Sequence, residues 1–143
     1  MKIRVGIYGY GNLGRGVEAA LRQNEDMETV GVFTRRAPGD LKTLTGIPVF
    51  AADSAPSMTD KIDVMILCGG SRTDLPVQTP ALAAHFNVVD SFDTHAKIPA
   101  HLAAVDAAAH SAGKTAVISV GWDPGMFSLQ RMLGGAILPV GED

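Results

Sequence analysis

Short apolar runs alternate along the chain with segments in which apolar residues recur at helical spacing. The apolar runs are typical of buried strands and cover residues 3–8, 28–34, 49–50, 63–68, 87–90 and 115–119. The helical patterns cover residues 12–24, a segment that opens near Thr73 or Asp74 with Pro76 in its first turn, residues 99–112 and residues 127–133. Strands that alternate with helices are joined by right-handed crossovers. The pattern therefore predicts an α/β fold with a doubly wound parallel sheet.

Glycines punctuate the last part of the chain. Gly113 follows the helical segment 99–112, and we expect it to cap that helix. Gly134 and Gly135 are expected to stop the helix over residues 127–133 in the same way. The apolar residues 136–138 come next, with little sequence after them for either piece to pack on. We therefore expect a truncated chain.

Composition excludes several classes of protein. A chain of 143 residues can form one domain with a genuine core but not two, and its 46% hydrophobic and 19% charged residues are ordinary for a globular protein. The net charge of −3 argues against a nucleic-acid partner. One cysteine and four histidines without the usual ligand spacings predict neither disulfides nor a metal site. No apolar stretch approaches the roughly 20 residues that span a bilayer, so we expect a cytoplasmic enzyme with no membrane partner.

A glycine-rich loop follows the first predicted strand. Gly9, Gly11 and Gly14 form the pattern G-x-G-x-x-G between that strand and a helix, which is the context that gives the pattern meaning. Gly9 permits a tight turn, Gly11 lets a pyrophosphate approach the backbone, and Gly14 lets the helix pack closely on the strand. The loop predicts a Rossmann-type dinucleotide site at the N-terminus of the helix. The alternative is a structural turn.

Two arginines end the second predicted strand. This position, about 20 residues beyond the loop, meets the adenosine ribose in such folds. An acidic residue there accepts a hydrogen bond from the 2′-hydroxyl of NAD, whereas arginine accommodates the 2′-phosphate of NADP. Arg35 and Arg36 follow Thr34, and no carboxylate occurs before Asp40. The arginines favour NADP as the cofactor; alternatively, they are solvated residues of a surface loop.

Three later segments follow strands at the edge where open parallel sheets bind ligands: residues 68–71, 90–93 and 121–126. In the first, Gly69 and Gly70 allow close approach of the backbone to a cofactor. We expect Cys68 to be a packed, inert thiol rather than a nucleophile, because nothing nearby in the sequence would lower its pKa.

The other two segments each place aspartate beside an aromatic residue. Asp93 follows Phe92, and Asp123 follows Trp122. Carboxylates at this edge would bind and orient a cationic substrate, and an ammonium group is the obvious candidate. The alternative, about equal for any single aspartate, is that it caps a loop or a helix.

These motifs together resemble a known family. The loop from Tyr10 to Arg15, Thr34-Arg35-Arg36, Cys68-x-Gly-Ser71 and above all Ser119-x-Gly-Trp-Asp-Pro-Gly-Met-Phe127 are similar to meso-diaminopimelate dehydrogenase along essentially the whole chain. The resemblance implies an NADP-dependent oxidative deamination in lysine biosynthesis. The D-centre of meso-2,6-diaminopimelate would lose a hydride to the cofactor, and hydrolysis would give L-2-amino-6-oxopimelate and ammonia.

The resemblance also implies roles for residues at matching positions. Asp93 and Asp123 would hold the reacting amino group as the catalytic pair. Trp122 and the backbone of Gly125 and Met126 would shape the substrate pocket. The cofactor would be bound by Gly9, Tyr10, Gly11, Asn12, Leu13, Gly14, Thr34, Arg35, Arg36, Cys68, Gly69, Gly70, Ser71, Ser91, Phe92, Asp93, Gly121, Trp122, Asp123 and Pro124.

The family has a second half that binds the distal end of the substrate and carries the dimer contacts. The resemblance therefore divides the chain into an NADP-binding domain over residues 1–125 and a segment over residues 126–143 that leads into a missing substrate domain. It implies a homodimer for the full-length protein, and nucleotide binding without appreciable turnover for this chain alone.

Two other functions stay open on the sequence. One is another NADP-dependent reductase, similar to homoserine dehydrogenase or dihydrodipicolinate reductase, against which the Trp122-Asp123 segment argues. The other is a non-catalytic sensor that binds NADP(H) and signals by changing its association.

Overall fold

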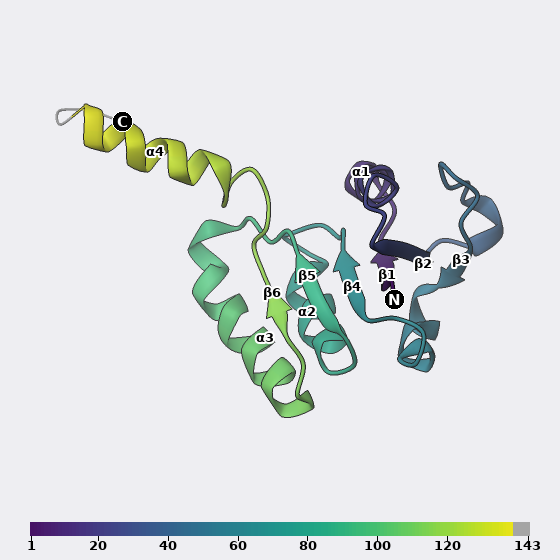
Figure 1. Cartoon of the computed structure of the whole chain (residues 1–143). Helices are drawn as coiled ribbons and strands as arrows, with labels where there is room; N and C mark the ends of the chain where they lie inside the picture. The colour runs from purple at the N-terminus through teal and green to yellow at the C-terminus, as the bar shows by residue number, and fades with distance from the viewer. Residues whose placement is uncertain (139–143) are drawn as a thin grey trace.

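A parallel sheet of six strands forms the centre of the molecule. The computed structural model describes residues 1–138, and its strands are β1 (Ile3–Tyr8), β2 (Met27–Thr34), β3 (Val49–Ala51), β4 (Val64–Leu67), β5 (Asn87–Asp90) and β6 (Ala116–Val117). Their order across the sheet is β3-β2-β1-β4-β5-β6, and every neighbouring pair is parallel. The chain changes direction across the sheet between β1 and β4 (Figure 1), so the predicted Rossmann-type, doubly wound fold is confirmed.

Helices cover both faces of the sheet. Helix α1 (Asn12–Leu21) lies on one face, and α2 (Leu75–Ala83) and α3 (Ile98–Ala112) lie on the other (Figure 1). The described residues also form helix α4 (Met126–Ile137) and the short 3-10 helices η1 (Pro38–Asp40), η2 (Ala52–Met58) and η3 (His95–Lys97). Alternate residues of β4, and Cys68 directly after it, contribute to two separate cores. Met65 and Leu67 join the core beneath α2 and α3, whereas Ile66 and Cys68 pack against the core beneath α1. None of the helices in residues 1–138 is long and apolar enough to cross a membrane.

Of the two helix ends predicted from glycines, one is confirmed and one is wrong. Gly113 caps α3 with a positive φ of 63°, as predicted. The prediction that Gly134 and Gly135 stop the last helix is wrong, because α4 continues through both and ends at Ile137. A glycine in a helix interior costs only about 1 kcal/mol relative to alanine, so two glycines in helical geometry do not end α4.

Other helices and strands differ by a few residues from the bounds that the sequence predicts. Helix α1 ends at Leu21, and the strand expected over residues 115–119 is reduced to the two residues of β6. Asp74 occupies the N-cap position of α2 but makes no capping hydrogen bond from its side chain. The segment η2 was not expected, although Ala55 within it is fully buried.

Helix α4 extends away from the sheet and from the other helices (Figure 1), and none of its residues is buried. It lies in the segment 126–143 that the sequence assigned to the lead-in of a substrate domain. Residues 139–143 of that segment lie outside the described residues, and the domain division stays a prediction.

Candidate functional site

The glycine loop between β1 and α1 has the geometry that its sequence predicts. Gly9 has a φ of +93°, and its N–H donates to the carbonyl oxygen of Phe33 over 2.9 Å. A methyl group at Gly14 would run into the carbonyl oxygen of Gly9, so only glycine allows this approach of helix and loop. A methyl group at Gly11 would meet nothing within 4 Å. The space above Gly11 is therefore open.

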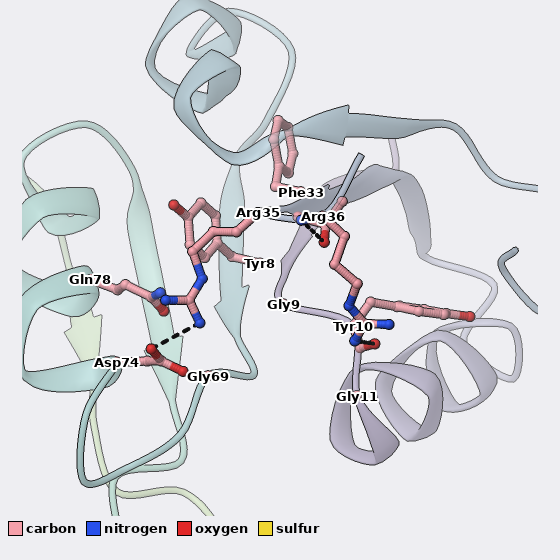
Figure 2. A pocket seen from close by; sticks show the side chains of 11 residues that line it. Tyr8, Gly9, Tyr10, Gly11, Phe33, Arg35, Arg36, Gly69, Asp74 and Gln78 are labelled. Carbon is pink, nitrogen blue, oxygen red and sulfur yellow. Dashed lines mark hydrogen bonds and ion pairs between the residues drawn. The ribbon is translucent and has the colours of Figure 1, made fainter. Parts of the chain in front are cut away.

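A pocket of about 380 Å³ lies against this loop (Figure 2). Its lining comes from the ends of β1, β2 and β4 and from the start of α2: Tyr8, Gly9, Tyr10, Gly11, Phe33, Thr34, Arg35, Arg36, Gly69, Asp74 and Gln78. A second hollow of about 430 Å³ shares Tyr8, Arg35 and Arg36 with it and reaches Asp53. The two hollows adjoin along the carboxyl edge of the sheet, where open parallel sheets bind ligands, and together they are called the crevice below.

The two arginines of this crevice are held differently. Arg35 forms an ion pair of 3.0 Å with Asp74, and Figure 2 shows it reaching toward α2. Arg36 lies on the other side, where its guanidinium donates to the main-chain oxygen of Tyr10 over 3.2 Å. Within residues 1–138 Arg36 has no carboxylate partner. Its charge is therefore available to an anion at the glycine loop.

The loop after β4 requires its first glycine. A methyl group at Gly69 would lie 2.6 Å from the side-chain oxygen of Gln78 and 2.9 Å from Cβ of Asp74. Burial raises the pKa of Cys68 to about 12, so the thiol is not ionised at neutral pH. This supports the prediction of a packed, inert cysteine.

Ser71 joins the loops after β4 and β5. Its hydroxyl oxygen accepts from the backbone N–H of Asp93 over 2.8 Å and from that of Thr94 over 3.2 Å. Because the hydroxyl fixes the main chain on both sides of Asp93, the carboxylate at that position starts from a defined backbone. The Asp93 side chain itself is exposed.

Asp90 at the end of β5 and Asp93 three residues later have opposite environments, since Asp90 is buried and Asp93 is exposed. Asp90 is fully buried, and its carboxylate accepts from the Thr79 hydroxyl over 2.8 Å and from the backbone N–H of Ser119 over 2.9 Å. It also pairs with His101 over 2.6 Å. Segment 90–93 was expected to face a ligand, but the carboxylate of Asp90 faces the core and joins β5 to the segment after β6.

Phe92 lies in the same core. Its ring is 1% exposed and stacks on His101 with 4.1 Å between ring centroids. Phe92 does not line the crevice, and its contact with a cofactor stays a prediction. Ser91 beside it is half-buried.

Asp123 is the centre of a small polar cluster at the start of α4. Both of its oxygens accept from Arg131, over 2.8 and 3.1 Å, and the Ser128 hydroxyl donates over 3.2 Å. The guanidinium of Arg131 holds the pKa of Asp123 below its usual range. Nε2 of His95 lies 3.7 Å from the same carboxylate, and His95 is two residues from Asp93. The loops that carry the two predicted catalytic aspartates are therefore neighbours.

The rest of the segment 121–126 is open to solvent. Trp122 is 69% exposed and stacks on Phe127 with 5.8 Å between ring centroids. Gly125 begins α4 with a φ of +148°, and a side chain there would collide with the main chain of Gly121. The backbone of Gly125 and Met126 is thus folded tightly, while the side chain of Met126 is exposed.

Known proteins resemble the chain over nearly its whole length. It is 63% identical over 141 residues to the meso-diaminopimelate D-dehydrogenase of Ureibacillus thermosphaericus, covering 99% of this chain and 43% of that protein. It is 47% identical over 136 residues to that of Corynebacterium glutamicum, covering 95% and 41%. Among solved structures, an engineered D-amino acid dehydrogenase bound to NADP+ gives a TM-score of 0.86 at 45% identity, covering 96% and 42%. The C. glutamicum DAP dehydrogenase in complex with DAP gives 0.84 at 46% identity, covering 95% and 41%.

The chain belongs to the meso-diaminopimelate dehydrogenase family. It spans less than half the length of the relatives it matches, and it corresponds to their N-terminal part. No protein-family profile matches it. Staphylococcus aureus homoserine dehydrogenase, with a TM-score of 0.65 at 14% identity, shares the fold alone.

Four residues that line the crevice were not predicted from the sequence. Tyr8, Phe33, Asp74 and Gln78 all line the pocket beside the glycine loop. Tyr8 and Phe33 are each the penultimate or last residue of a strand that ends at the crevice, which is a usable signal. Nothing in the sequence signals that Asp74 and Gln78 line the pocket, because they come close to Arg35 only through the connection between β4 and α2.

Proposed function

We propose that the chain is the NADP(H)-binding part of an enzyme that oxidatively deaminates meso-2,6-diaminopimelate at its D-centre, giving L-2-amino-6-oxopimelate and ammonia in lysine biosynthesis. The observation that carries the proposal is the guanidinium of Arg36, which has no carboxylate partner within residues 1–138 and lines the same pocket as Gly11, at a strand end where an NAD enzyme would have a carboxylate. The names of the relatives supply the substrate class. A homodimer of the full-length protein stays a prediction.

The residues present fit a dinucleotide with a 2′-phosphate. No side chain caps α1, so N–H groups of its first turn are left for a pyrophosphate. Gly9 and Gly11 would lie against the pyrophosphate, with Arg36 and Arg35 at the 2′-phosphate. When bound, NADP would accept the hydride that leaves the substrate carbon.

Asp93 and Asp123 would bind and orient the substrate's ammonium group. Asp93 has an exposed side chain on a backbone fixed by Ser71, and Asp123 is kept ionised by Arg131. Two carboxylates on neighbouring loops suit a cation. Their role is positioning, which contributes several kcal/mol to a transfer between two bound partners.

The test of the cofactor is a binding titration. Arg35→Ala combined with Arg36→Ala should weaken NADPH binding by at least about tenfold, because charge-assisted hydrogen bonds to the phosphate are lost, and should leave NADH binding nearly unchanged. Fluorescence of the reduced nicotinamide reports both affinities. Equal losses for the two cofactors would refute the assignment of NADP.

The test of the reaction uses a protein extended to the length of the relatives. We expect NADPH formation that depends on meso-diaminopimelate and disappears with Asp123→Ala. The 143-residue chain should bind NADPH without appreciable turnover. NADPH formation that is independent of diaminopimelate would contradict the substrate.

A further inference from the structure

Helix α1 carries a buried carboxylate that the proposed chemistry does not use. Glu18 is 1% exposed and accepts four hydrogen bonds from neighbouring elements. The Thr45 hydroxyl and backbone N–H donate over 2.5 and 2.8 Å, and the Leu44 N–H donates over 3.2 Å. The fourth donor is the phenol of Tyr10, in the glycine loop. Glu18 thus joins α1, the glycine loop and the segment that follows β2.

The carboxylate is ionised without a cation beside it. Burial alone would raise the pKa of Glu18, but the hydrogen bonds from Thr45, Tyr10 and Leu44 outweigh burial and lower it. No lysine, arginine or histidine within residues 1–138 forms an ion pair with it. A buried charge held by neutral donors alone is costly, so its neighbours are expected to depend on its position.

Tyr10 connects this carboxylate to the crevice. Its phenol bonds to Glu18 and accepts from the Leu44 N–H over 2.9 Å, while its main-chain oxygen accepts from the guanidinium of Arg36 over 3.2 Å. Neither Glu18 nor Thr45 lines the pocket. The contacts of Glu18 therefore lead toward Arg36 by two routes, through Tyr10 and through the segment that runs from the arginines to Leu44 and Thr45.

We propose that Glu18 is a positioning residue for cofactor selectivity: it anchors Tyr10 and residues 44–45 together, and so holds Arg36 over the glycine loop where a 2′-phosphate would lie. The inference rests on the proposed NADP function. A purely structural role for Glu18 makes a different prediction, because it would lower stability and the affinities for both cofactors without changing their ratio.

The test compares NADPH and NADH affinities of three variants with the unaltered chain. Glu18→Gln keeps the shape but replaces one carboxylate oxygen by an amide NH2, a donor that faces the N–H of either Leu44 or Thr45, and it should reduce the NADPH-to-NADH selectivity by about tenfold. Tyr10→Phe removes only the hydroxyl and should reduce selectivity by a smaller factor. Val105→Ala, in the core beneath α3, is the matched control that lowers the melting temperature and leaves selectivity unchanged.

Each outcome is decisive. If Glu18→Gln and Tyr10→Phe both keep the selectivity within about twofold of the unaltered chain, the positioning role is overturned while the NADP assignment stands. If Glu18→Gln fails to fold, Tyr10→Phe decides alone by the same criterion. If the unaltered chain shows no preference for NADPH, the proposed function itself fails, and that result is visible before any variant is measured.

Discussion

The two ends of the crevice differ in how completely the chain builds them. At the glycine loop, Gly14 and Tyr10 are buried, Glu18 is fully hydrogen-bonded, and Arg36 is held by main chain. After β6, the apolar side chains of Trp122, Met126, Phe127, Leu129, Met132, Leu133, Ile137 and Leu138 are all exposed. The residues at the glycine loop are packed and hydrogen-bonded to one another, whereas the segment after β6 presents its apolar side chains on an open surface.

The charges at the two ends show the same contrast. Arg36 has no carboxylate partner in the described part of the chain, so an incoming phosphate need not displace one. Asp123 has both oxygens occupied by Arg131, so an incoming ammonium must compete with a guanidinium. We therefore expect substitutions near the glycine loop to change stability and nucleotide binding strongly. Substitutions near α4 should have little effect on either.

The largest effect is expected from Gly14→Ala. The added methyl group runs into the carbonyl oxygen of Gly9, which is backbone and cannot move aside. Overpacking of this kind costs about 3 kcal/mol, which lowers the melting temperature by roughly 10 °C in a domain of this size. Calorimetry measures the shift. The control in the same helix is Gly16→Ala, where a methyl group meets nothing within 4 Å and should be neutral or stabilising. Equal losses for both variants would contradict the close approach.

The next effect separates the two arginines. Arg36→Ala should weaken NADPH binding by about tenfold, because it removes an unopposed cation from the phosphate site. Arg35→Ala should cost less, because Asp74 already offsets the charge of Arg35. Asp74→Asn is the informative control, since releasing Arg35 should tighten NADPH binding. A larger loss from Arg35→Ala than from Arg36→Ala would reverse the assignment of the phosphate ligand.

The sequence predicted those features that depend on local pattern. The strands and the glycine loop were predicted because strand and helix periodicities and the spacing of Gly9, Gly11 and Gly14 are encoded within a few residues. Position also predicted the two arginines at the end of β2, but not that Asp74 neutralises one of them. That contact depends on the crossover to α2, which the pattern does not fix in detail.

The predictions that were wrong concern features that depend on tertiary contacts. Asp90 and Asp93 stand three residues apart in the sequence, yet only Asp90 is buried, because Thr79 and His101 converge on it from α2 and α3. A four-residue segment cannot reveal which of its aspartates faces the core. Gly134 and Gly135 mislead for a related reason: a glycine pair is a helix stop only when the backbone adopts the left-handed conformation, as at Gly113.

A pH-dependent effect tests the ion pair between Arg4 in β1 and Asp63, the residue before β4. The side chain of Arg4 lowers the pKa of Asp63 from 3.8 to about 2. A carboxyl whose folded pKa is lowered stabilises the fold above its unfolded pKa, and that contribution is lost as the pH falls through the folded value. Asp63→Asn should therefore reduce the loss of unfolding free energy between about pH 4 and pH 2, measured by urea titration. Asp106→Asn, which removes a carboxylate without an ion pair in residues 1–138, is the control. An unchanged pH profile for Asp63→Asn would show that the pair does not persist in solution.

The smallest effect on stability is expected at α4. Arg131→Met keeps the apolar stem of the side chain and removes the guanidinium, so the pKa of Asp123 should rise toward its ordinary value. Because the ion pair is exposed and α4 buries none of its residues, the melting temperature should stay within about 2 °C. Carbon-detected NMR of the Asp123 carboxyl measures the pKa. Ser128→Ala, which removes a single hydrogen bond to the same carboxylate, should produce a smaller rise. A loss of stability comparable with that of Gly14→Ala would mean that α4 packs against the domain, and the contrast between the two ends of the crevice would fail.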